Sequence, residues 1–127
     1  MDTLINTGNV GIRRQHTYAD DVVDISGLTS FVSDAIPHNY CTSGIFTLYW
    51  SSFNALDAVA HLEGSFDGQT WNLLDEAGAT LDSATDTQLW DILYTSCLYI
   101  RISITLNSVT TGAIGFKFRG EFNDSKN

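Results

Sequence analysis

The most informative feature of this 127-residue chain is what it lacks between its two ends. No lysine or arginine occurs between Arg14 and Arg101, and the formal net charge is −9. The same interval holds twelve acidic residues: Asp20, Asp21, Asp24, Asp34, Asp57, Glu63, Asp67, Asp75, Glu76, Asp82, Asp86 and Asp91. Such a surface repels phosphate, which argues against direct binding to nucleic acid or to an anionic membrane. It suits a basic protein partner, a cation or plain solubility.

Other scarcities point to the fold class. Proline occurs once, at Pro37, and charged residues make up only 17% of the chain against 43% hydrophobic residues. Long runs of the helix formers Ala, Glu, Lys and Leu are absent, whereas Ser and Thr are abundant. Dense charge and low hydrophobicity would indicate disorder, and neither is present. The composition is typical of one all-β domain that is large enough to bury a core.

The cysteines and the chain start bear on the compartment. Cys41 and Cys97 lie far apart, and no CxxC pair occurs, so the sequence does not predict a zinc site. A disulfide between them is the alternative for a secreted chain, but we expect two half-buried thiols in a reducing compartment. The first residues lack the basic and apolar regions of a signal peptide, and no apolar run is long enough to span a membrane. We therefore expect synthesis in a cytosol.

The chain is organised around residues 58–74, AVAHLEGSFDGQTWNLL. Apolar residues alternate on both sides of Asp67-Gly68, and alternating runs joined at Asp-Gly are a strong hairpin signal. Gly68 adopts positive φ without steric cost, and Asp67 tolerates it. We expect an antiparallel pair that turns at these two residues. Phe66 and Trp71 would anchor the turn to a core.

Three further segments have the two-residue period of strands with one buried face. In 44–53, Phe46, Leu48 and Trp50 share the apolar face. In 97–106, that face is formed by Leu98, Ile100, Ile102, Ile104 and Leu106. In 114–122, it is formed by Ile114, Phe116, Phe118, Gly120 and Phe122. We expect this last strand to run antiparallel to 97–106.

The remaining segments are shorter. Residues 21–25 and 88–93 are predicted strands, 29–36 is either a short strand or a turn of helix, and 79–86 is either a loop or an edge strand. The result is seven to nine strands, which two sheets bury most simply as an antiparallel β-sandwich. A jelly roll is one form of it, and a closed barrel is the alternative. The polar residues 1–17 are interpreted as an extended N-terminal arm and 18–127 as the single domain.

Catalytic chemistry finds little support in the sequence. His61, Glu63 and Ser65 fall on one face of one strand, where they project side by side and do not converge as a nucleophilic triad must. No Gly-rich loop between a strand and a helix is present to bind phosphate. The sequence therefore predicts a protein that is not an enzyme and has no cofactor.

Acidic loops provide the only candidate metal ligands. Asp67 with Asp75, or Asp82 with Asp86, offer oxygen donors that calcium accepts, but the spacing of an EF-hand loop is absent. We expect no metal site. Among the aromatic residues, Trp50 and Trp71 are predicted to be core, and the surroundings of Trp90 stay open.

Exposed aromatic side chains are the remaining candidate binding residues. Tyr49, Tyr94 and Tyr99 lie on the polar sides or at the ends of their predicted strands. In such positions a tyrosine either stacks on a sugar ring or contributes to a protein interface.

The hairpin carries two resemblances that cover few residues. Ser65 to Trp71 is similar to the Asp-box of sialidase-like propellers, but it is one residue too short and occurs once. The same stretch resembles the S-x-D-G-x-x-W hairpin of discoidin-type domains, β-sandwiches that bind sugars or lipid head groups. That family usually joins its ends by a disulfide, whereas Cys41 and Cys97 lie in the middle of this chain. This second resemblance implies a carbohydrate-binding module.

A third resemblance spans residues 46–122. Small β-sandwich proteins of tailed-phage virions often combine L-x-G-S-x-D-G-x-x-W-x-x-L with a later Y-[IV]-R-[IV]-x-[IV] strand and a Gly-rich turn. This chain has these patterns at 62–74, 99–104 and 111–114. It resembles the head decoration (cement) proteins and related accessory proteins of phage particles.

That resemblance implies a structural protein of the virion, made in the host cytoplasm. Such a protein would bind the major capsid protein or other virion subunits and would stabilise the shell by burying surface. Arg13 and Arg14, the only adjacent basic pair, would contact acidic capsid groups from the arm. A homo-oligomer is expected, and a trimer would suit a capsid symmetry axis. Head, tail and fibre placement all stay open.

Overall fold

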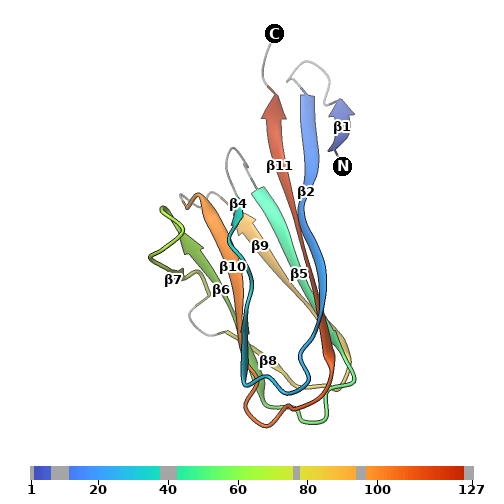
Figure 1. The fold of residues 1–127 in the computed structure, drawn as a ribbon. Coiled ribbons are helices and arrows are strands. Elements are labelled where there is room, and N and C mark those ends of the chain that lie inside the picture. Colours follow the sequence, from blue (N-terminus) through green and yellow to red (C-terminus); the bar gives the residue numbers. More distant parts are fainter. Residues whose placement is uncertain (1, 7–11, 38–42, 76–77, 94–96, 125–127) are drawn as a thin grey trace.

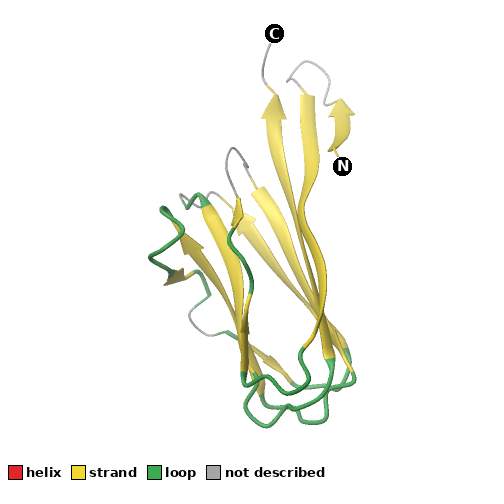
Figure 2. Ribbon diagram, in the orientation of Figure 1, coloured by secondary structure: helices red, strands yellow, loops and turns green. Residues whose placement is uncertain are grey.

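Two antiparallel sheets pack face to face in this protein (Figures 1 and 2). The structure is a computed structural model, and it describes residues 2–6, 12–37, 43–75, 78–93 and 97–124. The described residues form strands, turns and loops, and they include no helix that could cross a membrane. The predicted all-β sandwich is confirmed, with two separate sheets in place of a closed barrel.

The first sheet has five strands. In spatial order they are β1 (Asp2–Asn6), β2 (Ile12–Asp24), β11 (Ala113–Asp124), β5 (Ser43–Ser51) and β9 (Asp86–Leu93). The second sheet has six strands. Its main path is β3 (Ser30–Val32), β10 (Tyr99–Thr105), β6 (Ala58–Ser65) and β7 (Asn72–Leu73); β4 (Ile36–Pro37) also pairs with β10, and β8 (Ala79–Leu81) also pairs with β6.

The core is a set of alternating side chains from β5 and β11 facing those of β6 and β10. In the five-stranded sheet, Phe46 lies opposite Phe118, Leu48 opposite Phe116 and Trp50 opposite Ile114. The inner residues of the second sheet are also buried: Ala58, Ala60, Leu62, Ile100, Ile102 and Ile104. Each large apolar side chain removed from water in this way contributes about 1.5–3 kcal/mol to folding. The period-two prediction for 44–53, 97–106 and 114–122 thus locates the core correctly among the side chains that the structure describes, with Leu98 as an exception; the side chain of Phe122 lies outside them.

The prediction that the last two long strands pair with each other is wrong, and so is the predicted burial of Leu98. The last two long strands do not pair, because β10 lies in the six-stranded sheet and β11 in the five-stranded sheet, and their apolar faces meet across the core. A period of two reveals that each strand has a buried face, but it does not distinguish a lateral neighbour from a facing one. Leu98 is 43% exposed, because β10 begins only at Tyr99.

The predicted count of seven to nine strands is too low. Eleven strands are present in the described chain; the unpredicted β1 has five residues, and the short edge strands β3, β4, β7 and β8 have two or three. Residues 29–36 form β3 and the start of β4, and 79–86 contains β8. The predicted strands 21–25 and 88–93 correspond to the ends of β2 and β9; both strands begin earlier than predicted, and β2 ends at Asp24. Short edge strands have too few residues for a periodic pattern to identify them.

Residues assigned to an N-terminal arm lie in the five-stranded sheet. β2 continues through position 17 and pairs with β11 from Ile12 to Asp24, while β1 pairs with Ile12 to His16. The β2–β11 register shifts at Tyr18, because Thr17 lies opposite Arg119 and Ala19 lies opposite Phe118. Such a bulge bends and twists a strand. Beyond it, β1 and the ends of β2 and β11 project past the rest of the sandwich (Figure 1).

Two phenylalanines test the assignment of the core. Phe46 is fully buried, whereas Phe66 is 65% exposed. We expect Phe46→Ala to lower the free energy of unfolding by about 3–5 kcal/mol, because it leaves a cavity between the sheets. Phe66→Ala should change it by about 0.5 kcal/mol or less. Urea unfolding followed by tryptophan fluorescence measures both, and equal effects would contradict this assignment.

Candidate interaction surfaces

The central hairpin is closed by a loop built on two side chains. The Ser65 hydroxyl accepts hydrogen bonds from the backbone N–H groups of Asp67 and Gly68, at 3.2 and 2.9 Å. The Asp67 Oδ1 accepts from the N–H groups of Gln69 and Thr70, both at 2.8 Å, and from the Ser65 hydroxyl at 3.0 Å. Gly68 has φ of +77°. Five hydrogen bonds within six residues hold this loop in one shape.

The prediction of a two-residue turn at Asp67-Gly68 is therefore wrong. β6 ends at Ser65 and β7 begins at Asn72, so the connection is a loop of residues 66–71. Ser65 is 3% exposed and breaks the alternation of β6, which leaves Phe66 on the solvent side and not in the core. Ser and Asp side chains that bond the backbone two or three residues ahead compete with a hairpin turn. That spacing is visible in the sequence and could have predicted the loop.

The same hydrogen bonds account for the state of the Asp67 carboxyl. Its pKa falls from 3.8 to about 2, mainly because the Thr70 and Gln69 N–H groups and the Ser65 hydroxyl donate to the charged form. An oxygen already occupied by three donors is poorly placed to ligate calcium. The described residues contain no group of three or more His, Cys, Asp or Glu side chains arranged for a metal ion.

Trp71 lies on the outer face of the six-stranded sheet. The Arg101 guanidinium carbon is 4.1 Å from the centre of its ring, and Arg101 Nε donates to Glu63 Oε1 at 2.7 Å. Glu63 and Arg101 are directly opposite on β6 and β10. The prediction of Trp71 as a core residue is wrong, since it is half-buried and covers a cross-strand ion pair. This arrangement fixes the loop over the sheet through a cation–π contact.

His61 is bonded to the loop that follows β7. Its Nδ1 lies 3.0 Å from the backbone oxygen of Asp75, and the Asp75 Oδ2 accepts from Trp90 Nε1 at 2.7 Å. Trp90, left open by the sequence, is half-buried and packs its edge on Phe46. These contacts connect the sheets at their β7–β9 side.

The tyrosines proposed as contacts differ in their surroundings. Tyr99 is half-buried beside the 66–71 loop, close to Gly68. Tyr94 lies outside the described residues. Tyr49 is 37% exposed on the outer face of the five-stranded sheet, where it lies opposite Gly115 of β11. A Cβ added to Gly115 would be 2.1 Å from this ring, so the glycine lets the tyrosine lie across the strand.

The outer face of the five-stranded sheet carries a group of exposed apolar side chains that the sequence reasoning did not assemble. This outer apolar patch consists of Val22 on β2, Ile45 and Tyr49 on β5, and Leu89 on β9, with exposed fractions between 37% and 69%. Val22 and Tyr49 flank Gly115, and Leu89 lies opposite Thr47, between Ile45 and Tyr49. The sequence signal for the patch was that these apolar residues occupy the predicted solvent-facing positions of their alternating strands.

A hollow of about 200 Å³ adjoins the patch at Ile45. Asp91 and Arg119 also line it. An antiparallel sheet with one solvated face normally presents polar residues there. Contiguous exposed apolar surface next to a hollow is instead typical of a protein interaction site.

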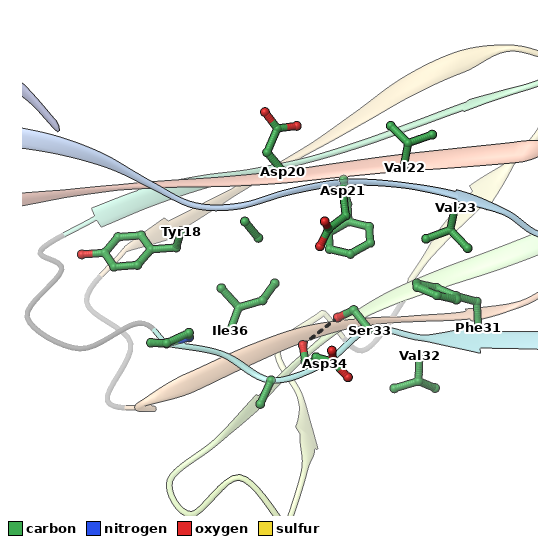
Figure 3. A pocket seen from close by; sticks show the side chains of 14 residues that line it. Tyr18, Asp20, Asp21, Val22, Val23, Phe31, Val32, Ser33, Asp34 and Ile36 are labelled. Atoms are coloured by element: carbon green, nitrogen blue, oxygen red, sulfur yellow. Dashed lines mark hydrogen bonds between the residues drawn. The ribbon is translucent and has the colours of Figure 1, made fainter. Parts of the chain in front are cut away.

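A second concave feature lies between the two sheets at their open side (Figure 3). This edge cleft, of about 500 Å³, is bounded by β2 and by the segment from β3 to β4. Tyr18, Asp21 and Val23 point from β2 toward that segment, whereas Asp20 and Val22 point to the other side of the strand (Figure 3). The rings of Phe31 and Phe116, 6.0 Å apart, lie among its walls.

The two arginines predicted to dock and the two cysteines complete the predicted residues. Arg13 lies opposite Ile5 on β1 and Asn123 on β11, and Arg14 lies opposite Leu4 and Phe122. The pair is thus in the projecting end of the five-stranded sheet. Cys41 lies outside the described residues, and Cys97 is half-buried against the core near Gly64.

No protein-family model and no curated protein sequence matches the chain. Among solved structures, that of Bacillus endospore appendages, described as a family of disulfide-linked pili, has a TM-score of 0.50 at 8% identity and covers 95% of this chain and 96% of its own. The Yersinia pseudotuberculosis-derived mitogen has a TM-score of 0.47 at 17% identity, over 86% and 88% of the two chains. At 8% identity, the first likeness shows a shared sandwich fold alone.

The hydrogen bonds of Asp67 predict a pH dependence of stability. Because the pKa of Asp67 in the folded protein is about 2, below the 3.8 of an unperturbed aspartate, the charged form stabilises the fold above about pH 4, and this contribution is lost as the pH falls toward 2. Asp67→Asn keeps the shape but removes the charge. We expect wild type to exceed this variant in stability at pH 7, with the gap closing by about pH 2.

Urea unfolding between pH 2 and pH 7 measures that gap. Gln69→Ala serves as the control, because the Gln69 backbone N–H, not its side chain, makes the bond to Asp67. Its stability difference from wild type should stay constant with pH. A gap for Asp67→Asn that is also constant would contradict the assigned role of the carboxylate.

Proposed function

We propose that this protein is a non-enzymatic structural subunit that docks onto the surface of a phage capsid, as a decoration or cement protein does. The observation that carries the proposal is the outer apolar patch. Val22, Ile45, Tyr49 and Leu89 come from three strands of one rigid sheet and remain exposed. Burying such a patch against another subunit releases water from apolar surface, which is the main favourable term in protein association.

Two further features support the proposal. Arg13 and Arg14 belong to the stretch of β2 that pairs with β1 and the end of β11, and an arginine pair in this projecting end suits an acidic partner surface (Figure 1). The resemblance of residues 62–74 and 99–104 to phage accessory proteins supports the kind of partner. In the structure, those two segments hold the 66–71 loop and the Glu63–Arg101 pair, so the motif serves the scaffold and leaves the docking surface to other residues.

Leu89 provides the direct test of docking. It is 59% exposed in the patch, while Leu56 is 52% exposed in the loop between β5 and β6. We expect Leu89→Glu to weaken binding to assembled tailed-phage capsids that lack their decoration protein by at least about tenfold, since a desolvated charge opposes docking. Leu56→Glu is the matched control and should bind as wild type does.

Co-sedimentation with these capsids measures the binding, and thermal unfolding verifies that both variants are folded. Light scattering of the chain alone tests the expected homo-oligomer. Equal binding by Leu89→Glu and wild type, or equal losses in both variants, would contradict the role of the patch.

One observation favours the second candidate, a carbohydrate-binding module. Tyr49 lies across Gly115, so one side of its ring is packed on the sheet while 37% of the residue stays exposed. A tyrosine ring held against a strand offers a platform for a sugar ring. This candidate predicts glycan-array binding by the purified chain that is lost in Tyr49→Ala and kept in Leu56→Glu. Absence of glycan binding by the wild type would remove it.

A further inference from the structure

Strand β2 is paired along the whole of one edge but along only part of the other. β11 pairs with β2 from Ile12 to Asp24, but on the other side β1 reaches only from Ile12 to His16. No strand in the described part of the chain lies along Ala19 to Asp24 on that side. A strand edge presents backbone N–H and C=O groups that an extended peptide from another chain can bind.

This open edge borders the edge cleft. Across the cleft, β3 and β4 pair with β10 only at Ser30–Val32 and Ile36–Pro37, and Ser33 bridges the interval through its hydroxyl, which accepts from the Ile102 N–H at 3.1 Å. The six-stranded sheet therefore has an interrupted strand where it faces β2. The space of about 500 Å³ between them is large enough to receive side chains of an added strand.

The charges in the cleft indicate what kind of strand it accepts. Its lining includes Asp20, Asp21 and Asp34 and no Lys or Arg. The Asp20 side chain points to the other face of β2, so Asp21 and Asp34 are the acidic groups of the cleft (Figure 3). Lys117 lies on the neighbouring strand, 3.8 Å from Asp20, in an exposed pair. Asp21 points toward the core side of β2 yet remains exposed, so its carboxylate faces the cleft (Figure 3). An inward-facing acid at an edge disfavours pairing with an acidic strand.

A second copy of this chain is for the same reason a poor occupant of the open edge. Two β2 edges side by side would bring Asp20, Asp21 and Asp24 of each copy together in a protein whose net charge is already −9. Like charges placed opposite each other in a sheet are destabilising. A strand that carries Lys or Arg gains from the same carboxylates.

We propose that Ala19 to Asp24 of β2 receives, by β-strand addition, an extended segment of a partner protein in which Lys or Arg side chains alternate with apolar ones. The partner's backbone bonds to the open edge, its basic side chains enter the cleft toward Asp21 and Asp34, and its apolar side chains lie on the opposite face of the added strand. This goes beyond docking through the outer apolar patch, because it concerns a different surface and specifies the chemistry of the partner segment.

The test uses a fluorescent eight-residue peptide of alternating Lys and Val. Two matched peptides accompany it, one with Glu in place of Lys and one N-methylated at alternate amides so that it cannot pair as a strand. We expect the Lys peptide to bind wild type, with anisotropy and amide hydrogen exchange as readouts. Slower exchange should appear at residues 19–24, and neither matched peptide should bind. Higher salt should weaken the binding.

Two variants separate the cleft from overall charge. Asp21→Lys should weaken binding of the Lys peptide by at least about tenfold. Asp82→Lys makes the same charge change in the exposed loop between β8 and β9, on the opposite side of the sandwich, and should bind as wild type does apart from a small general effect. If Asp21→Lys fails to fold in a thermal melt, Asp34→Lys at the other wall of the cleft takes its place.

Several outcomes would overturn the inference. They are equal binding of the N-methylated peptide, equal losses in Asp21→Lys and Asp82→Lys, protection that maps away from residues 19–24, and self-association of the wild-type chain through this edge. Loss of capsid binding in Leu89→Glu together with no peptide binding by wild type would reject strand addition and leave capsid docking intact. Peptide binding by wild type together with unchanged capsid binding in Leu89→Glu would reject capsid docking through the patch and leave strand addition intact.

Discussion

β11 is the strand on which the rest of the structure depends, because it pairs along its whole length with β2 on one side and from Ala113 to Glu121 with β5 on the other. Its inner residues Ile114, Phe116 and Phe118 occupy the middle of the core. The outer side of the same strand, at Gly115, is flat enough for Tyr49 to lie across it. The large inner residues of β11 thus form part of the core, and Gly115 shapes the outer face beside Tyr49.

The conspicuous sequence motif and the candidate interaction surfaces lie in different parts of the molecule. Ser65, Asp67 and Trp71 are used to build and hold a loop, through hydrogen bonds to backbone N–H groups and a contact with Arg101. A motif whose polar atoms are occupied in this way stabilises a scaffold. The exposed surfaces come from residues outside the 62–74 motif. Because the motif residues build the scaffold, a resemblance to this motif predicts the fold of the protein better than its function.

The two proposed contact surfaces differ in physical character. The outer apolar patch lies on a flat sheet face and would associate through burial of apolar area. The edge cleft combines an unpaired strand edge with carboxylates, so it would select a partner by backbone pairing and charge. The acidic surface that argues against nucleic acid therefore has a specific consequence in this fold, because it disfavours edge pairing with an identical copy and favours a basic strand.

The sequence by itself determined the fold class and most of the core. A strict period of two identifies the buried residues of β5, β10 and β11, because burial of one sheet face is a local property of a strand. Only the tertiary structure decided that β10 and β11 face each other across the core, that Ser65 and Asp67 replace a tight turn by a loop, and that Phe66 is exposed. It also brought Val22, Ile45 and Leu89 onto one face and placed Asp21 and Asp34 on opposite sides of a cleft. These arrangements depend on which strands become neighbours, and a pattern read along one strand contains no information about its partner.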